Sequence, residues 1–306
     1  MRDTMANTLI AFDRQLDFVY GQPHEVSPLV RRVVARNPSA FTLHGTGTYI
    51  VGRGEVAVID PGPDLPAHVA ALQACLAGEQ VTHIVITHTH RDHSPAAKPL
   101  KSATGAPTYG FGPHGSGRPE GGGEEVEEGG DLEFRPDVRL ADSETIAGKG
   151  WTLRAVYTPG HTSNHLCFQL AEEKALFSGD HVMGWSTTIV SPPDGDMRRY
   201  MASLDKLLAR DDLSYIPTHG PVIRQPQGFV RHLIRHRQER EAQILDCLKQ
   251  GIGLIPDMVK AIYREVPVTL HAAAGRSVLS HLIAMVEDGR ARSDGPVSAR
   301  ARFRPA

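Results

Sequence analysis

The segment from Thr87 to Ser94, with the sequence THTHRDHS, constrains this chain more than any other. Within six residues it holds three imidazoles and one carboxylate, which are His88, His90, Asp92 and His93. The apolar run Ile84-Val85-Ile86 precedes it, and a loop leaving such a strand can turn several side chains toward one point. Imidazole nitrogens and carboxylate oxygens are the usual ligands of zinc and similar divalent ions. The segment therefore predicts a metal site at the end of a buried strand.

The same arrangement recurs along the chain, because potential ligands follow four other short apolar runs. These ligands are Asp60, His161, Asp180 and His219. Loops at strand ends carry binding residues because a rigid sheet holds their bases in place. One loop of this kind would be weak evidence, but five of them in chain order make one convergent site the simplest interpretation.

Hydrophobic patterning predicts an alternation of strands and helices around these loops. Strands are expected over residues 41–51, 55–59, 82–86, 153–157, 166–170, 175–177 and 214–216. Helices are expected over residues 65–76, with Asp64 as the N-cap, directly after Ser94-Pro95, and over 197–208. The Gly- and Glu-rich stretch 112–130 has almost no apolar side chain and predicts a surface loop.

Composition limits the classes of protein that this chain can belong to. Its 306 residues suffice for a large domain and a smaller one, and its net charge of −2 argues against a chain-wide nucleic-acid surface. No apolar run approaches the roughly 20 residues that span a bilayer, and residues 1–7 lack the apolar core of a signal peptide. Three widely spaced cysteines are typical of a reducing compartment. We therefore expect a cytoplasmic protein with no membrane partner.

The motif order H-x-H-x-D-H, then His, Asp and His, resembles the metallo-β-lactamase superfamily over roughly residues 40–225. This resemblance implies an α+β fold, an αββα sandwich with a two-metal site at one edge. It implies three ligand groups: His88, His90 and His161 for the first metal, Asp92, His93 and His219 for the second, and Asp180 bridging both. Asp60 would orient ligands rather than bind metal. Ser94-Pro95 departs from the small residues or glycines that many members have there, which leaves the shape of this loop open.

Such a site predicts a metal-dependent hydrolase whose nucleophile is a hydroxide shared by two divalent ions. Zinc is the expected metal, with iron or manganese as alternatives. No serine of a nucleophile elbow and no cysteine lies near the motifs, so no protein nucleophile is expected. Asp92 would also orient the attacking hydroxide. His165 and His181 are candidate proton donors to the leaving group, with a purely structural role as the alternative for each.

The C-terminal part, residues 226–306, has a different character from the catalytic part, residues 1–225. Helices are expected over residues 229–248, 256–263 and 275–287, followed by a hairpin over 290–303. This order resembles the winged-helix domain of a β-lactamase-like subfamily that includes mitochondrial single-strand-RNA endonucleases and many bacterial hydrolases. The third helix would then expose Arg276, Ser277, Ser280 and His281. The arginines near the end of the chain form either a basic flap for an anionic substrate or a solvated terminal charge run.

Two substrate classes therefore remain open, a small ester or thioester and single-stranded RNA. β-Lactams are not expected as substrates of a cytoplasmic chain. A DNA-binding regulator with a metal-sensing domain is an alternative of another class, although a sensor has no need of a complete dimetal ligand set. The sequence leaves the oligomeric state undetermined.

Overall fold

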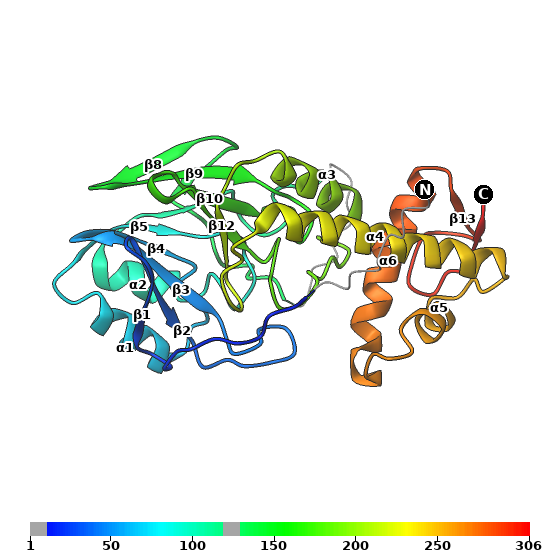
Figure 1. Ribbon diagram of the computed structural model, residues 1–306, viewed down its shortest axis with the longest axis horizontal. Coiled ribbons are helices and arrows are strands. Elements are labelled where there is room, and N and C mark those ends of the chain that lie inside the picture. Colours follow the sequence, from blue (N-terminus) through cyan, green and yellow to red (C-terminus); the bar gives the residue numbers. More distant parts are fainter. Residues whose placement is uncertain (1–10, 119–128) are drawn as a thin grey trace, which may run out of the picture.

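The computed structural model describes residues 11–118 and 129–306, and its larger part is built around two facing β-sheets (Figure 1). The seven strands of the first sheet follow the chain order: β1 (Pro23–Ser27), β2 (Val30–Val34), β3 (Gly47–Arg53), β4 (Glu55–Ile59), β5 (Gln80–Val85), β6 (Thr108–Gly110) and β7 (Val138–Arg139). The second sheet has the order β12 (Ser214–Pro217), β11 (Ala175–Gly179), β10 (Leu166–Leu170), β9 (Trp151–Tyr157) and β8 (Thr145–Gly148). A short 3₁₀ turn, Ala171–Glu173, connects β10 to β11.

Side chains alternate between the two faces of these strands, which produces the layers of the sandwich. In β3, Tyr49 and Val51 point into the core between the sheets, whereas Ile50 points outward. Helices α1 (Pro66–Cys75) and α2 (Ala97–Thr104) cover the outer face of the first sheet, where Leu72 and Leu100 pack. Helix α3 (Met197–Leu208) covers the outer face of the second. The predicted αββα sandwich is confirmed.

The C-terminal part forms a smaller unit that the long helix α4 joins to the sandwich (Figure 1). It contains α4 (Pro226–Lys249), α5 (Ile255–Ile262), a 3₁₀ turn (Val268–Leu270), α6 (His271–Glu287), β13 (Ala291–Ser293) and β14 (Phe303–Pro305). The first half of α4 packs on the sandwich through Val230 and Leu233, and its second half belongs to the C-terminal core through Ile244 and Leu248. We propose the domain boundary at residue 225, directly before this shared helix.

Several element boundaries differ from the predicted ones for local reasons. The strand expected from residue 41 begins at Gly47, because Leu43 and Gly45 take positive φ values of 55° and 131° that no strand accepts. The N-cap of α1 is Leu65 rather than Asp64, and its side chain forms no cap bond. Helix α2 begins at Ala97, since the Ser94 hydroxyl donates to Asp131 at 2.6 Å instead of capping a helix. Strands β1, β2, β6, β7 and β8 were not predicted.

Helix α6 differs from the prediction in a way that bears on function. It begins at His271, about one turn earlier than expected, and packs against α3, α4 and α5. Ser277, Ser280 and His281, which were predicted to face solvent, are only 9%, 2% and 1% exposed. The prediction that these residues are exposed is therefore wrong for all but Arg276, the one of the four that is exposed.

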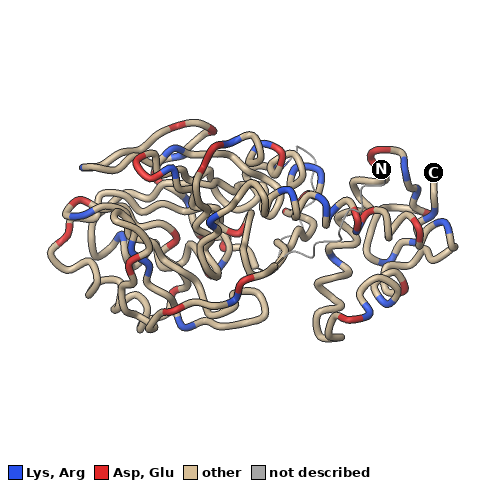
Figure 2. The backbone as a smooth tube through the Cα atoms, in the orientation of Figure 1, with Lys and Arg blue, Asp and Glu red and all other residues tan. Residues whose placement is uncertain are grey.

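Charges on the C-terminal unit are mixed rather than gathered into one basic face. Figure 2 shows Lys and Arg interspersed with Asp and Glu along this unit. Arg290 pairs with Glu241 and Asp288, and Arg304 lies 3.3 Å from Asp294. Of the stretch predicted as a surface loop, residues 119–128 lie outside the described residues, as does the N-terminal stretch 1–7. Among the described helices, none is long and apolar enough to cross a membrane.

Candidate metal centre

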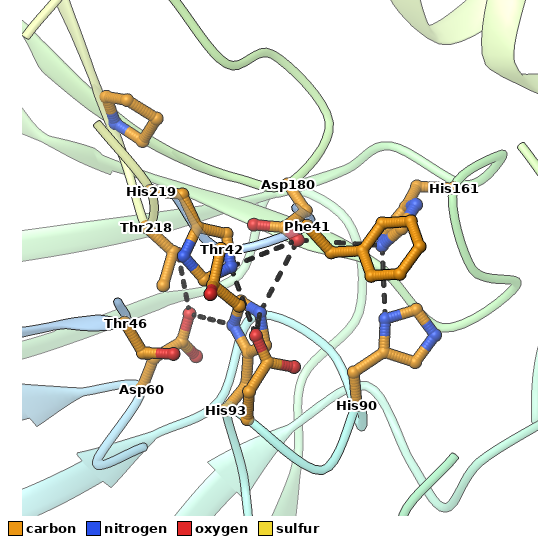
Figure 3. Close-up of polar contacts among 12 residues, drawn as sticks. Phe41, Thr42, Thr46, Asp60, His90, His93, His161, Asp180, Thr218 and His219 are labelled. Carbon is orange, nitrogen blue, oxygen red and sulfur yellow. Dashed lines mark hydrogen bonds and ion pairs between the residues drawn. The ribbon is translucent and has the colours of Figure 1, made fainter. Parts of the chain in front are cut away.

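Five strands deliver the potential ligands to one edge of the sandwich. Strands β4 and β5 run parallel in the first sheet, and β11 and β12 run parallel in the second. Strand β9 has the same direction as β11, because both are antiparallel to β10. The Thr218 hydroxyl after β12 donates to Asp60 after β4, so the carboxyl ends of the strands of both sheets meet at this edge. The side chains that follow them converge there, as Figure 3 shows for most of the cluster.

Three histidines form one half of the cluster. The Nε2 atom of His88 lies 3.0 Å from Nδ1 of His90, and Nε2 of His161 lies 3.1 Å from the same atom. Ligand nitrogens around a tetrahedral zinc ion, at about 2.0–2.1 Å from the metal, lie about 3.3 Å apart. The spacing of these nitrogens therefore fits one divalent ion.

The other half of the cluster combines two histidines with Asp92. Nε2 of His219 lies 3.1 Å from Oδ2 of Asp92, and Nε2 of His93 lies 3.5 Å from the same oxygen. Asp180 lies between the halves, since its Oδ2 is 3.5 Å from His93 and His219 and 3.8 Å from His161 (Figure 3). The structure thus brings together all seven residues predicted as ligands, in three groups whose ligand atoms lie within 4.8 Å of one another.

A buried carboxylate, that of Asp60, supports this arrangement through hydrogen bonds. Asp60, fully buried after β4, accepts hydrogen bonds on Oδ2 from Nδ1 of His93 at 2.9 Å and from the Thr218 hydroxyl at 3.0 Å. Its two oxygens also accept from the backbone N–H and the hydroxyl of Thr87, at 2.8 and 2.7 Å. A proton held on Nδ1 of His93 leaves Nε2 available as a ligand, which is the usual role of a carboxylate behind a metal-binding histidine.

Backbone carbonyls orient two further histidines in the same way. Nδ1 of His161 lies 2.6 Å from the carbonyl oxygen of Ile189, and Nδ1 of His219 lies 3.1 Å from that of Gly45. A carbonyl oxygen only accepts, so each ring carries its proton on Nδ1 and presents Nε2 to the cluster. The tautomer of each ring is therefore the one that a metal ligand needs.

The electrostatics of the cluster favour bound positive charge. Burial opposes the charged form of His219, yet Asp180 and Asp92 raise its pKa to about 10. Burial likewise opposes the charged form of Asp180, but His219 and His93 hold the pKa of this carboxyl well below its usual range. Nε2 of His93, Nε2 of His219 and Oδ1 of Asp180 are buried, and among the described residues they have no hydrogen-bond partner. These atoms fit divalent metal ions, which would take the place of the protons.

The two histidines proposed as proton donors lie beneath the cluster rather than in front of it. Nε2 of His165 accepts from the backbone N–H of Asp180 at 3.3 Å, and Nδ1 donates to the Thr158 hydroxyl at 2.9 Å. Burial lowers the pKa of His165 well below its usual value and that of His181 to about 3, so both are neutral at physiological pH. We propose that His165 positions Asp180, in place of the proton transfer expected from the sequence. Gly179 permits this approach, because a Cβ atom there would lie 2.5 Å from Nε2 of His165.

A pocket of about 420 Å³ opens over the cluster, and the C-terminal unit forms part of its wall. Asp92, Asp180, His90 and His161 of the cluster line it, and Phe41, Met183 and Ile189 supply apolar wall. Ala273 and Arg276 of α6 also line it, and the remaining lining residues are Ser39, Thr42, Arg91, Gly129 and Ser191. Phe41, Met183 and Ile189 were not predicted as site residues, and Arg276 was predicted only as an exposed residue of the winged-helix domain, because no local pattern shows which helix will close a pocket.

Comparison with known proteins places the chain among metal-dependent hydrolases. Residues 42–219 match the family model of the metallo-beta-lactamase superfamily, and residues 255–299 match that of the beta-lactamase associated winged helix domain. The Beta-lactamase-like protein 2 homolog of Drosophila melanogaster is 34% identical over 274 residues, covering 86% of this chain and 89% of that protein. An atrochrysone carboxyl ACP thioesterase of Cryptosporiopsis sp. is 32% identical over 229 residues, covering 74% of this chain and 65% of that protein. The crystal structure of a metallo-beta-lactamase family protein from Thermus thermophilus has the same fold, with a TM-score of 0.73, 22% identity and coverage of 92% of this chain and all of that one.

Proposed function

Because the chain belongs to the metallo-β-lactamase superfamily and carries its associated winged-helix domain, we propose that it is a dinuclear-metal thioesterase. The membership confirms the resemblance seen in the sequence, and members of the superfamily are hydrolases that use divalent metals. The observation that carries the proposal is the pocket of about 420 Å³ over the His and Asp cluster, in which Phe41, Met183 and Ile189 form an apolar part of the wall. A small acyl group fits such a pocket, whereas an RNA strand requires an open basic groove.

The seven clustered side chains would hold the two ions. We assign His88, His90 and His161 to one ion, Asp92, His93 and His219 to the other, and Asp180 to a position between them. Two bound divalent ions would lower the pKa of a water molecule and polarise the thioester carbonyl. The side chain of Asp92 is 27% exposed and lines the pocket, so it is the carboxylate that can accept a hydrogen bond from the attacking water and orient it.

The chemistry of the leaving group also favours a thioester. No group suited to donate a proton at neutral pH lines the pocket among the described residues, since His165 and His181 are neutral and buried beneath the cluster. A thiol has a pKa of about 8.5, so a thiolate leaves without protonation. The sugar alkoxide released from RNA is far more basic and needs an acid. The thioesterase named among the relatives supports the same substrate class for this chain.

A test compares three substrates on protein loaded with zinc, manganese or iron. We expect about two ions per chain by elemental analysis, hydrolysis of acyl thioesters, and no cleavage of single-stranded RNA or of a generic phosphodiester. If the metal-loaded protein cleaves RNA and leaves thioesters intact, the proposal is refuted. A salt titration of RNA binding adds an independent readout, because phosphate contacts make affinity fall steeply with added salt.

A further inference from the structure

A second hollow, of about 300 Å³, adjoins the metal pocket and lies between the sandwich and the C-terminal unit. Phe41, Met183, Ile189 and Ala273 line both spaces, so the two are neighbours across these four side chains. Further apolar wall comes from Trp185 and Tyr263. The described cluster of metal-ligand candidates does not extend into this hollow, and the hydrolytic step does not require it.

Two arginines of α4 line the hollow. Arg237 is 4% exposed, donates to the carbonyl oxygen of Thr188 and lies 3.5 Å from the Ser277 hydroxyl. The guanidinium of Arg240 stacks over the ring of Tyr263 at 4.0 Å and donates to Gln243 at 2.8 Å. Stacking and side-chain amide contacts hold a guanidinium in place without neutralising its charge.

These two positive charges have no acidic partner in the part of the chain that the structure describes. The carboxylates nearest in sequence are engaged elsewhere, Glu239 at 3.8 Å from Arg235 and Glu241 with Arg290. The Nε atoms of Arg237 and Arg240 are buried, and no described residue hydrogen-bonds to them. An unpaired charge in such a place is costly, so proteins normally compensate it with a counter-ion.

Burial and the positive charge of the two arginines lower the pKa values of two nearby histidines. Burial, together with Arg237 and Arg240, lowers the pKa of His236 to about 4 and that of His281 to about 3. Both histidines are therefore neutral at physiological pH and add no further charge. The hollow combines aromatic and aliphatic walls with two guanidinium groups that no described carboxylate pairs with, which is the environment that an apolar molecule with an acidic group requires.

We propose that this hollow binds an oxyanion carried by the substrate, a carboxylate on the acyl group or a phosphate on the thiol portion. The inference rests on the proposed thioesterase function and makes Arg240 and Arg237 determinants of specificity. They would select thioesters that carry an acidic group close to an apolar body. Arg237 also holds the backbone at Thr188, so Arg240 is the better position for a test.

The variant is Arg240→Gln, with Arg231→Gln as the matched control, because Arg231 is exposed on the same helix. Two pairs of thioesters serve as substrates, and the members of each pair differ in a single charged group. The first pair is the N-acetylcysteamine thioester of a dicarboxylic acid and its methyl ester, and the second is an uncharged acyl group on phosphopantetheine and on pantetheine. We expect Arg240→Gln to lower kcat/KM for the acidic member of one pair by about 10- to 100-fold, the range of a lost charged hydrogen bond. The neutral member and the metal content should be unchanged.

Binding measured without turnover separates this inference from the proposed function. Calorimetric titration of the metal-loaded chain with 4-phenylbutyrate and with its amide, and with pantetheine phosphate and pantetheine, tests the hollow directly. If Arg240→Gln binds an acidic probe more weakly and Arg231→Gln does not, the result supports oxyanion binding in the hollow even if no thioester is hydrolysed. The pair of probes that is affected shows whether the anion is a carboxylate or a phosphate. Equal binding of every probe by the wild type and both variants would overturn the inference, while thioester hydrolysis could still stand.

Discussion

Substitution of Asp60 by asparagine tests the support behind the proposed metal ligands. Asp60 has a φ of 47°, a left-handed conformation that asparagine also accepts, so the backbone need not change. The side chains have the same size, and the substitution alters only charge and hydrogen bonding. Any effect on stability or metal affinity therefore comes from the polar contacts of this one group.

The size of the effect follows from the donors that face Asp60. Oδ1 accepts from the backbone N–H of Thr87, and Oδ2 accepts from Nδ1 of His93, and neither donor can rotate away. An amide has only one oxygen, so its NH₂ group must face one of these two donors. Loss of a hydrogen bond to a charged group costs about 1.5–3 kcal/mol, and a buried unpaired donor about 1–3 kcal/mol. We expect the free energy of unfolding of the metal-loaded chain to fall by about 3–5 kcal/mol.

His93 can escape this conflict only by moving its proton from Nδ1 to Nε2, the atom that faces the metal cluster. The unpaired donor then disappears, but metal binding must reverse the shift. We therefore also expect metal affinity to fall about 10- to 100-fold, as is usual when such a supporting carboxylate is lost. Urea denaturation measures the first effect, and competition with a zinc chelator measures the second. Asp64→Asn is the control, since Asp64 is exposed four residues further along the same loop. An Asp60→Asn protein that matches the wild type in both assays would show that Asp60 supports neither the fold nor metal binding.

Substitutions of Asp180, His165 and His281 should change metal content, turnover and stability, respectively. Asp180→Ala should lower the metal content from about two ions to one or fewer and abolish hydrolysis, since Asp180 lies within 3.5–3.8 Å of histidines of both halves; elemental analysis that still finds two ions would contradict this. His165→Gln should lower kcat but keep the shape of the pH–rate profile, whereas loss of its alkaline limb would identify His165 as a proton donor. His281 has a pKa of about 3 in the folded protein, against about 6.5 in the unfolded chain. Its imidazole is neutral in both at high pH, and as the pH falls the unfolded chain binds a proton first, which destabilises the folded protein. The free energy of unfolding should thus fall by about 2 kcal/mol more in the wild type than in His281→Gln between pH 7.5 and 5, and parallel stability curves would exclude this contribution.

The candidate site was largely predictable from the sequence because its signals are local. His88, His90, Asp92 and His93 occupy one short segment behind an apolar strand, and the side chains of such a segment cannot lie far apart. Asp180 and His219 each follow a short strand. Since strands of one sandwich share an edge, their order along the chain already indicated convergence.

The role of His165 could not be derived in this way. Its nearness to His161 in the sequence made it a candidate at the reaction centre, but it lies after the loop has turned back toward β10. Which side of the cluster a side chain occupies depends on the path of this loop through space. Only the tertiary structure places His165 beneath Asp180, where burial keeps it neutral.

The helices of the C-terminal unit were predictable as elements, but their partners were not. A 3.6-residue period identifies the apolar stripe of α6, with Val278 and Leu282 toward the local core. Ser277 and Ser280 resemble surface residues by composition, yet small side chains also allow helices to approach closely, and here both are buried. The sequence alone determined the metal-binding motif, the sandwich and the presence of an appended domain, because each depends on neighbours along the chain. The tertiary structure alone decided that α4 and α6 line the spaces beside the cluster with Arg240 and Arg276, because the packing of two distant helices depends on the complementarity of whole surfaces.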